Sequence, residues 1–208
     1  YESQHDGFDR GTIRRVEAKE HVFRESDPRT HVFRIEEGVI ALSKLLSDGR
    51  RQIIDFAYPG DYIGLGILTE HIFDAQATCA AKVRCLSAAT LEHDASSDAR
   101  LALKLYKAVS AELVAARSLL VSVGQKTAME RIAAFLIDLH ARNTRAVDDT
   151  NIVKLPMRRS DIGDLLGLTI ETVSRTITKL RTMRVIDVIN GTEVHILNSD
   201  RLGELAGA

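Results

Sequence analysis

The stretch from Asp98 to Val123 constrains the fold most, because it contains neither proline nor glycine. Apolar residues recur there at alternating intervals of three and four: Tyr106, Val109, Leu113, Ala116, Leu120 and Val123. This spacing places them on one side of a helix, as in the seam between two helices that pack knobs into holes. A helix of about 25 residues is nearly 40 Å long, more than a small domain requires. We therefore predict that residues 98–124 form a dimerisation helix. The alternative is a helix that buries the same stripe against its own domain.

The residues before this helix alternate between apolar and polar types in short runs. Turn-forming residues interrupt the pattern at Glu37-Gly38, Asp48-Gly49 and Pro59-Gly60-Asp61, and Ser47-Asp48-Gly49 is a good hairpin turn. The segments AQATCAA (75–81) and VRCLSAATL (83–91) continue the alternation. Closely spaced short strands predict a small barrel or roll, so we assign residues 1–97 to an N-terminal β-roll.

Helical spacing returns after Gly124, which we expect to interrupt the long helix. In residues 126–143 the apolar positions Ile132, Phe135, Leu136 and Leu139 fall on one face. Residues 143–156 are polar and include Pro156, which predicts a loop. We assign residues 125–208 to a second, C-terminal domain.

Two short helices joined by a tight bend are predicted between Asp161 and Leu180. Ile162, Leu165 and Leu166 form an apolar face that ends at Gly167, and Thr169 can cap the next helix. Val173, Ile177 and Leu180 would bury one side of this second helix, and Glu171, Ser174 and Arg175 lie on another face in its first turns. This is the arrangement of a helix-turn-helix, in which early residues of the second helix reach base edges in the major groove.

A hairpin is predicted directly after these helices. The segment RVIDVINGTEVHI (184–196) contains two short strands around Asn190-Gly191, a strong signal for a two-residue turn. A hairpin in this position gives a winged helix-turn-helix.

The net charge of −1 conceals a basic region. Seven cations lie between Ile152 and Arg184: Lys154, Arg158, Arg159, Arg175, Lys179, Arg181 and Arg184. Three acids, Asp161, Asp164 and Glu171, leave this segment at +4 and the rest of the chain at −5. A local basic patch is what a phosphate-binding surface needs, since its field decays within about a Debye length. A solvated helix face is the alternative.

The motifs LSDGRRQI, PGD, ERIAAFL and LPM..SDIGDLLGLTIETVSR, together with the predicted order of elements, resemble the CRP/FNR family of bacterial transcription regulators, and its FNR and FixK branch in particular. The resemblance extends from about Arg14 onward and implies an α+β fold: an N-terminal β-roll like a cyclic-nucleotide-binding jelly roll, a long dimerisation helix and a C-terminal winged helix-turn-helix. It also implies a homodimer in the cytoplasm that acts together with RNA polymerase.

The resemblance assigns roles to individual residues. In this branch the pattern E-x-x-S-R reads the half-site TTGA within a palindrome, so Glu171 and Arg175 would contact bases with Ser174 beside them. Arginine suits the O6 and N7 atoms of guanine, and glutamate suits the amino group of cytosine. Arg159, Thr169 and Thr172 match phosphate-contacting positions, which orient a protein without reading sequence. The alternative for Glu171 and Arg175 is a surface ion pair worth a few tenths of a kcal/mol.

The resemblance also raises the question of what the β-roll binds. The cyclic-AMP branch carries a glutamate after the glycine of the roll and an Arg-Ser pair beyond it, whereas here Leu65 follows Gly64 and Ala75-Gln76 stand further on. Residues 62–81 contain no lysine or arginine, and an unpaired buried phosphate is costly. We therefore expect no cyclic AMP.

An iron–sulfur cluster needs more thiols than this sequence offers. Cys85 lies near the fourth cluster position of the FNR branch, but Cys79 is the only other cysteine, and two thiols cannot hold a cluster alone. We expect both to be small buried apolar residues rather than redox sensors. The chain begins with Tyr1, so upstream cysteines stay open; its first ten residues show no signal peptide. The seven histidines are scattered and form no metal motif, although a haem ligand stays open: His5, His21, His31, His71, His93, His140 and His195.

These features favour a FixK-like regulator, an activator that binds a TTGA-type palindrome as a homodimer without cyclic AMP, cofactor or metal. The alternative is an effector-gated regulator with a haem, an iron–sulfur cluster or a small metabolite in the β-roll. An enzyme is the third possibility, disfavoured because the sequence has no nucleophile–base motif, phosphate-cradling glycine loop or metal signature.

Overall fold

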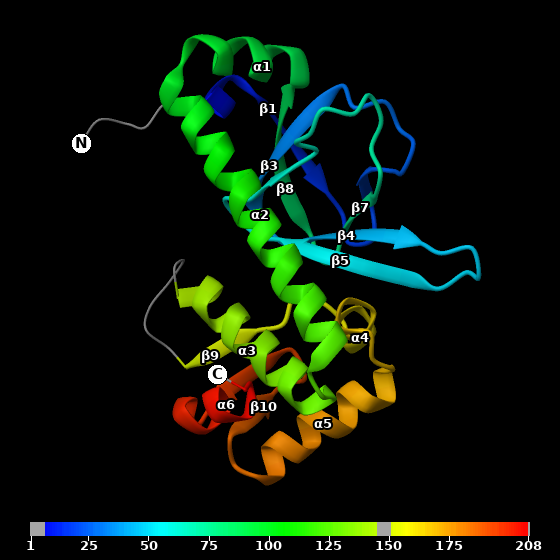
Figure 1. The fold of residues 1–208 in the computed structure, drawn as a ribbon, viewed down its shortest axis with the longest axis vertical. Helices are drawn as coiled ribbons and strands as arrows, with labels where there is room; N and C mark the ends of the chain where they lie inside the picture. Colours follow the sequence, from blue (N-terminus) through cyan, green and yellow to red (C-terminus); the bar gives the residue numbers. More distant parts are fainter. Residues whose placement is uncertain (1–6, 145–150, 208) are drawn as a thin grey trace. The chain divides into compact units, whose positions relative to one another are not determined.

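The computed structural model describes residues 7–144 and 151–207. Residues 1–6, inspected above for a signal peptide and including His5, and the middle of the 143–156 loop lie outside these ranges. The chain falls into two compact units, Tyr1–Arg117 and Ser118–Ala208, which meet within one helix and are described separately (Figure 1).

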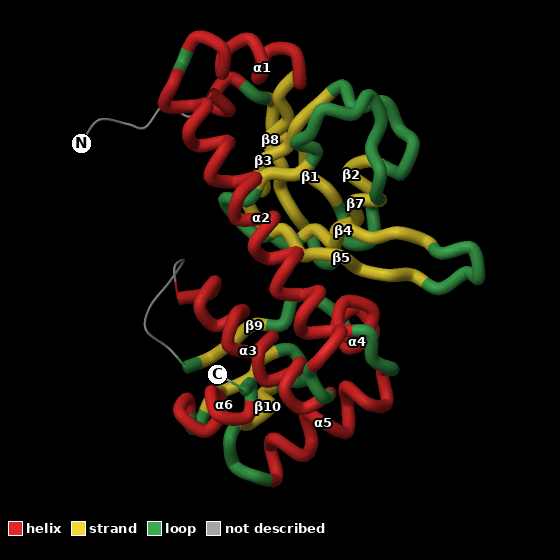
Figure 2. The backbone as a smooth tube through the Cα atoms, in the orientation of Figure 1, coloured by secondary structure: helices red, strands yellow, loops and turns green. Residues whose placement is uncertain are grey.

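The first unit is the predicted β-roll. Its strands are β1 (Thr12–Val16), β2 (His21–Phe23), β3 (His31–Glu37), β4 (Ile40–Leu45), β5 (Arg51–Ala57), β6 (Tyr62–Ile63), β7 (Asp74–Ala77) and β8 (Ala81–Ser87). They form two antiparallel sheets, ordered β1-β8-β3-β6 and β2-β7-β4-β5 (Figure 2). Phe33 and Val83 from one sheet and Ile40 and Ala75 from the other share one buried core. Gly38, Gly49 and Gly60 have positive φ angles, which confirms the three predicted turns.

The prediction of strand through residue 91 was wrong. The last strand ends at Ser87, whose hydroxyl accepts a hydrogen bond from the amide of Thr90 and caps α1 (Ala88–Ser97). Ala88 and Leu91 are both buried. Because Ala88 and Leu91 are three residues apart, they lie on the same face of the helix. The prediction failed because a run as short as SAATL does not distinguish a strand from a helix.

The long helix α2 spans Ala99–Gln125 and passes through Gly124. A Cβ on Gly124 would meet nothing within 4 Å, and one glycine costs a helix only about 1 kcal/mol, so the expected interruption falls two residues later. Leu101 and Leu105 pack against Phe8 and Leu91 of the first unit. This contact uses a different side of α2 from the predicted seam.

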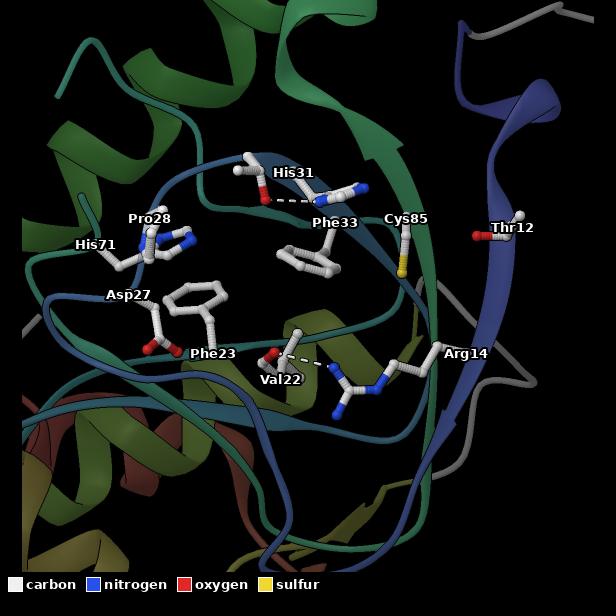
Figure 3. Close-up of a pocket in the computed structure, with 11 residues that line it drawn as sticks. Thr12, Arg14, Val22, Phe23, Asp27, Pro28, His31, Phe33, His71 and Cys85 are labelled. Atoms are coloured by element: carbon white, nitrogen blue, oxygen red, sulfur yellow. Dashed lines mark hydrogen bonds between the residues drawn. The ribbon is translucent and has the colours of Figure 1, made fainter. Parts of the chain in front are cut away.

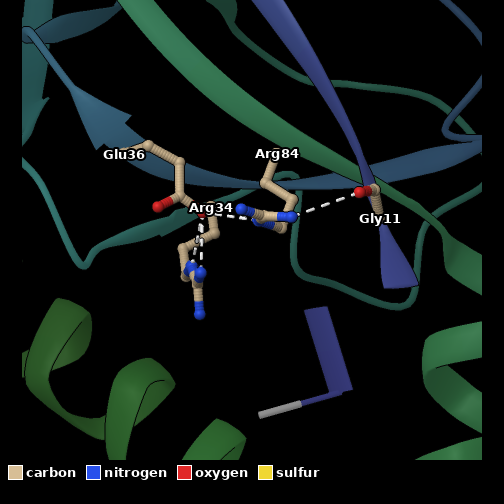
Figure 4. A network of polar contacts seen from close by, with 4 residues as sticks. All are labelled: Gly11, Arg34, Glu36 and Arg84. Atoms are coloured by element: carbon tan, nitrogen blue, oxygen red, sulfur yellow. Dashed lines mark hydrogen bonds and ion pairs between the residues drawn. The ribbon is translucent and has the colours of Figure 1, made fainter. Parts of the chain in front are cut away.

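A half-buried ion network holds the segment around Gly11 to the roll (Figure 4). The Glu36 carboxylate accepts hydrogen bonds from Arg84 Nε at 2.7 Å and Arg34 Nη2 at 2.7 Å. Arg84 also donates to the Gly11 carbonyl at 3.3 Å, beside the short helix η1 (Gly7–Arg10). Burial raises the pKa of Glu36, but the two arginine hydrogen bonds outweigh it and leave that pKa below its usual value.

The second unit is a winged helix-turn-helix. It contains α3 (Ala128–Thr144), β9 (Ile152–Lys154), α4 (Arg159–Leu166), α5 (Ile170–Thr182), β10 (Ile186–Ile189), β11 (Glu193–Ile196) and α6 (Ser199–Leu205), besides the end of α2. Its sheet has the order β10-β11-β9. The predicted apolar face of α3, Ile132, Phe135, Leu136 and Leu139, is buried and therefore confirmed.

Two details of this unit differ from the sequence prediction. Part of the predicted 143–156 loop is the strand β9, where Val153 is fully buried and pairs with Val194 of β11. A three-residue strand is too short to show the alternation of apolar and polar residues that predicts a strand. Its hydrogen bonds come from β11, about forty residues further along the chain, so no local signal indicates it. The wing turn contains three residues, Asn190, Gly191 and Thr192, because Ile189 pairs with Glu193, so the two-residue prediction was one residue short.

Within the described ranges, no helix is both long and apolar enough to cross a membrane.

Candidate nucleic-acid interface

The first helix of the motif, α4, is held at both ends by local hydrogen bonds. Asp161 is only 8% exposed, and its carboxylate accepts from the Arg158 amide at 2.9 Å. At the other end Gly167 adopts a left-handed conformation (φ 64°), and its amide donates to the Gly163 carbonyl. The Leu168 amide donates to the same carbonyl at 3.0 Å, so Gly163 organises the bend.

Gly163 is also the tightest point of this bend. A Cβ added there would lie 2.6 Å from the Leu168 carbonyl oxygen, a backbone atom that cannot rotate away. Gly163 was not among the predicted functional residues, although a glycine inside a helical pattern is a signal of close packing.

Gly163→Ala should therefore destabilise the second unit, although alanine is the better helix former. Overpacking of this kind costs about 1–3 kcal/mol. The matched control is Gly203→Ala in α6, where a Cβ meets nothing within 4 Å and stability should stay level or rise by about 0.5–1 kcal/mol. Urea denaturation compares the two variants, and equal midpoints for Gly163→Ala and the parent would contradict the predicted clash.

The second helix, α5, begins as predicted at the Thr169 cap. The Thr169 hydroxyl accepts from the Thr172 amide at 3.3 Å and lies 3.1 Å from the Thr172 hydroxyl. Val173, Ile177 and Leu180 are buried on the inner side of the helix. The expected helix-turn-helix geometry is confirmed.

The three predicted base-contacting residues lie on the outer side of α5. Glu171 and Arg175 are exposed and Ser174 is half-buried. The Glu171 carboxylate accepts hydrogen bonds from the Glu171 amide and from the Thr169 hydroxyl, and both lower its pKa. The positive charge of Arg175 lowers the pKa of Glu171 further. In the part of the chain that the structure describes, Glu171 and Arg175 form no direct ion pair, which disfavours the surface-pair alternative. Both side chains are exposed to solvent, although the Glu171 carboxylate already accepts a hydrogen bond from Thr169.

Most of the basic side chains in residues 152–184 are exposed on the surface of the second unit. Of the seven cations between residues 152 and 184, only Arg159 is half-buried and the others are exposed. One of the three acids, Asp161, turns inward to cap α4. The exposed charge of this segment is therefore mainly positive.

The predicted seam of α2 is uncovered in the single chain. Tyr106 is 69% exposed, Leu113 49% and Leu120 74%. Val109 and Ala116 are also exposed, and Val123 is half-buried. The β-roll therefore leaves Tyr106, Val109, Leu113 and Ala116 uncovered, contrary to the alternative in which α2 buries this stripe against its own domain.

The β-roll contains a cavity of about 410 Å³ (Figure 3). Residues of β1, β2, β3 and β8 and their connecting loops line it: Thr12, Arg14, Val22, Phe23, Asp27, Pro28, Thr30, His31, Phe33, His71 and Cys85. The His71 ring stacks on Phe23 at 3.6 Å, and burial lowers the pKa of His71. His31 and His71 are far apart in the sequence and were predicted to be scattered, and only the closed roll brings them to one cavity.

Arg14 supplies a cation to this cavity from outside residues 62–81, the segment that contains no lysine or arginine. Its guanidinium donates to the Val22 carbonyl at 3.0 Å, the His21 carbonyl at 2.9 Å and the Glu20 carboxylate at 2.7 Å. The charge is therefore already compensated, and Asp27 adds a negative charge to the lining. Both features disfavour a phosphate ligand.

Neither cysteine belongs to a metal cluster in the described ranges, where no group of three or more His, Cys, Asp or Glu residues could hold a metal. Cys79 and Cys85 are free and half-buried, and Cys85 packs against the apolar core of the roll. Burial raises the pKa of the Cys85 thiol, which keeps it protonated and poorly reactive.

The fold, with the exposed outer side of α5, defines a winged helix-turn-helix protein joined to a β-roll. The pattern of the cyclic nucleotide-binding domain matches residues 13–93, and that of the Crp-like helix-turn-helix domain matches residues 130–205. The chain is 40% identical over 189 residues to the nitrogen fixation regulation protein FixK of Bradyrhizobium diazoefficiens, covering 91% of this chain and 79% of that protein. It is 37% identical over 207 residues to the transcriptional activatory protein AadR of Rhodopseudomonas palustris, covering 99% and 86%.

Among solved structures, FixK2 from Bradyrhizobium japonicum superposes with a TM-score of 0.88 at 36% identity, covering 95% of this chain and 98% of that one. The chain belongs to the CRP/FNR family of bacterial transcription regulators and resembles its FNR and FixK branch. It is accordingly a DNA-binding regulator and not an enzyme.

Proposed function

We propose that this protein is a FixK-like activator that binds a TTGA…TCAA palindrome as a homodimer and needs no cyclic AMP. The observation that carries the proposal is the exposed face of α5, where Glu171 and Arg175 have no ion pair with each other and stand among exposed cations. In this proposal Glu171, Ser174 and Arg175 contact bases, and Arg159, Thr169 and Thr172 contact phosphates. RNA polymerase is the partner at the promoter, in the cytoplasm.

The uncovered seam of α2 supports homodimerisation. Two parallel copies of Tyr106, Val109, Leu113, Ala116, Leu120 and Val123 would pack as knobs into holes. Residues 98–124 then act as the dimerisation helix between a β-roll (1–97) and a DNA-binding domain (125–208). A two-fold dimer presents two α5 helices, which matches a palindrome.

The proposal is tested by titrating the protein against three duplexes: the palindrome, a shuffled sequence of the same composition and a single half-site. We expect affinity for the palindrome on the order of 10³-fold above the shuffled duplex or more, with two chains bound. Equal affinity for the palindrome and the shuffled duplex would overturn the proposed sequence specificity.

Cyclic AMP should change nothing, because a ligand shifts an equilibrium only through differential affinity for its states. A cyclic phosphate needs a cation that is free to pair with it. In this cavity Arg14 already pairs with Glu20, and Asp27 adds a negative charge. Titration calorimetry and a shift assay with saturating cyclic AMP provide the measurement. Micromolar binding accompanied by tighter operator affinity would contradict this expectation.

A second candidate function is suggested by the cavity of the β-roll, which pairs a stacked His71 with Phe23. In that case a small uncharged metabolite, a haem or a cluster completed by upstream residues would gate DNA binding. A visible absorption spectrum of the anaerobically purified protein tests for a haem or a cluster, because both absorb there and the aporegulator does not.

A further inference from the structure

Arg131, on the first turn of α3, binds three backbone carbonyls at once. Its Nη2 donates to the Val123 carbonyl at 2.7 Å, its Nε to Lys126 at 2.8 Å and its Nη1 to Leu166 at 2.8 Å. Val123 lies in the last turn of α2, Lys126 directly follows that helix, and Leu166 is the last residue of α4. Carbonyls at helix ends lack partners within the helix and carry partial negative charge, so one guanidinium satisfies the ends of two helices.

Further contacts hold the joint between the end of α2, the start of α3 and the end of α4. Lys126 Nζ donates to the Ala206 carbonyl, at the end of α6, at 2.7 Å. Thr127 and Glu130 form a reciprocal cap on α3, with the Thr127 amide 2.6 Å from the Glu130 carboxylate. A Cβ on Gly167 would lie 3.4 Å from Val123, so the end of α4 packs directly on the last turns of α2. All of these residues belong to the unit Ser118–Ala208.

We infer that Arg131 is a positioning residue that fixes the direction of the end of α2 relative to α4 and α5, and thereby sets the half-site spacing that the dimer accepts. The inference rests on the proposed function. If two chains join along the last turns of α2, the angle between these turns and α5 determines how far apart the two reading helices lie. One inserted base pair moves a half-site by about 3.4 Å and rotates it by about 34°.

The chemistry of arginine suits this role better than that of lysine. Arginine presents five N–H donors in a rigid planar fork, which can bridge carbonyls from separate segments. Lysine keeps the charge on a single flexible ammonium and would hold fewer of the three carbonyls in fixed directions. Without either cation, water would solvate the freed carbonyls and the joint would become more pliable.

The experiment measures the affinity of the full chain for palindromes whose central spacer is optimal, or shorter or longer by one or two base pairs. The variants are Arg131→Met and Arg131→Lys. Arg142→Met removes an arginine from the far end of α3, where it pairs with Asp138, and serves as the charge control. Ile132→Val makes a mild core defect beside Arg131 and serves as the stability control.

We expect the parent to lose affinity on the order of tenfold per base pair of wrong spacing. Arg131→Met should reduce this loss to about threefold or less, Arg131→Lys should fall between, and both controls should keep the parental profile. If Arg131→Met does not fold, Arg131→Lys decides alone.

A parental spacer profile in the folded Arg131 variants would overturn the inference, even if their affinity fell equally on all spacers. Flattening by Ile132→Val as well would also overturn it, since general destabilisation would then explain the effect. A parent that does not distinguish any palindrome from shuffled DNA would instead show failure of the proposed function.

Discussion

Leu113→Asp should convert the protein to a monomer at concentrations where the parent is a dimer. Leu113 is 49% exposed in the single chain and lies at the centre of the predicted seam. In a symmetric parallel helix pair the two aspartates would face each other in an apolar interface, where unpaired charge is costly. We expect dimer affinity to fall on the order of 10³-fold or more, as measured by sedimentation equilibrium.

The matched control is Ser118→Asp, which adds the same charge to an exposed position of α2 off the seam. This variant should remain a dimer. The Leu113→Asp monomer should also lose about 10²- to 10⁴-fold in operator affinity, because the second half-site is no longer bound intramolecularly. A persistent Leu113→Asp dimer would show that the seam is not the interface.

Arg175→Ala should weaken binding to the palindrome far more than binding to random DNA. A bidentate contact between arginine and guanine contributes about 1–3 kcal/mol of discrimination, and a dimer carries two copies, so the total can approach twice that value. Arg175 is exposed on the first turns of α5, so its removal should not perturb the fold. Titrations on both duplexes across a salt series provide the measurement.

Arg159→Ala is the matched comparison, since it removes an arginine from the start of α4. As a phosphate contact, it should weaken binding to both duplexes alike and reduce the slope of log affinity against log salt by about one unit per subunit. Equal losses for Arg175→Ala on the palindrome and on random DNA would assign Arg175 to phosphate rather than to a base.

The helix-turn-helix could be predicted from sequence because its signals are local. The Thr169 cap, the left-handed Gly167 and the buried Val173, Ile177 and Leu180 are each determined by residues within about two turns of the helix. The alternating strands of the β-roll were likewise predictable where a glycine turn separates them. The family resemblance adds the roles of Glu171 and Arg175, which local physics does not assign.

The rest depends on partners that are remote in sequence. Strand β9 exists because β11 supplies its hydrogen bonds, and the His31–His71 cavity exists because the two sheets close. Arg131 lies in the quoted motif ERIAAFL, but its carbonyl partners Val123 and Leu166 come from two other helices. A sequence pattern shows that an arginine is present, whereas only the folded chain shows which helix ends it joins.

The most direct test of the central claim is selection of bound DNA from a random duplex pool by the purified full-length chain, without cyclic AMP. We predict enrichment of two inverted TTGA half-sites at one fixed spacing, the signature of two α5 helices related by a two-fold axis. An enriched pool with no shared sequence, or with single half-sites at variable spacing, would contradict a sequence-specific homodimer.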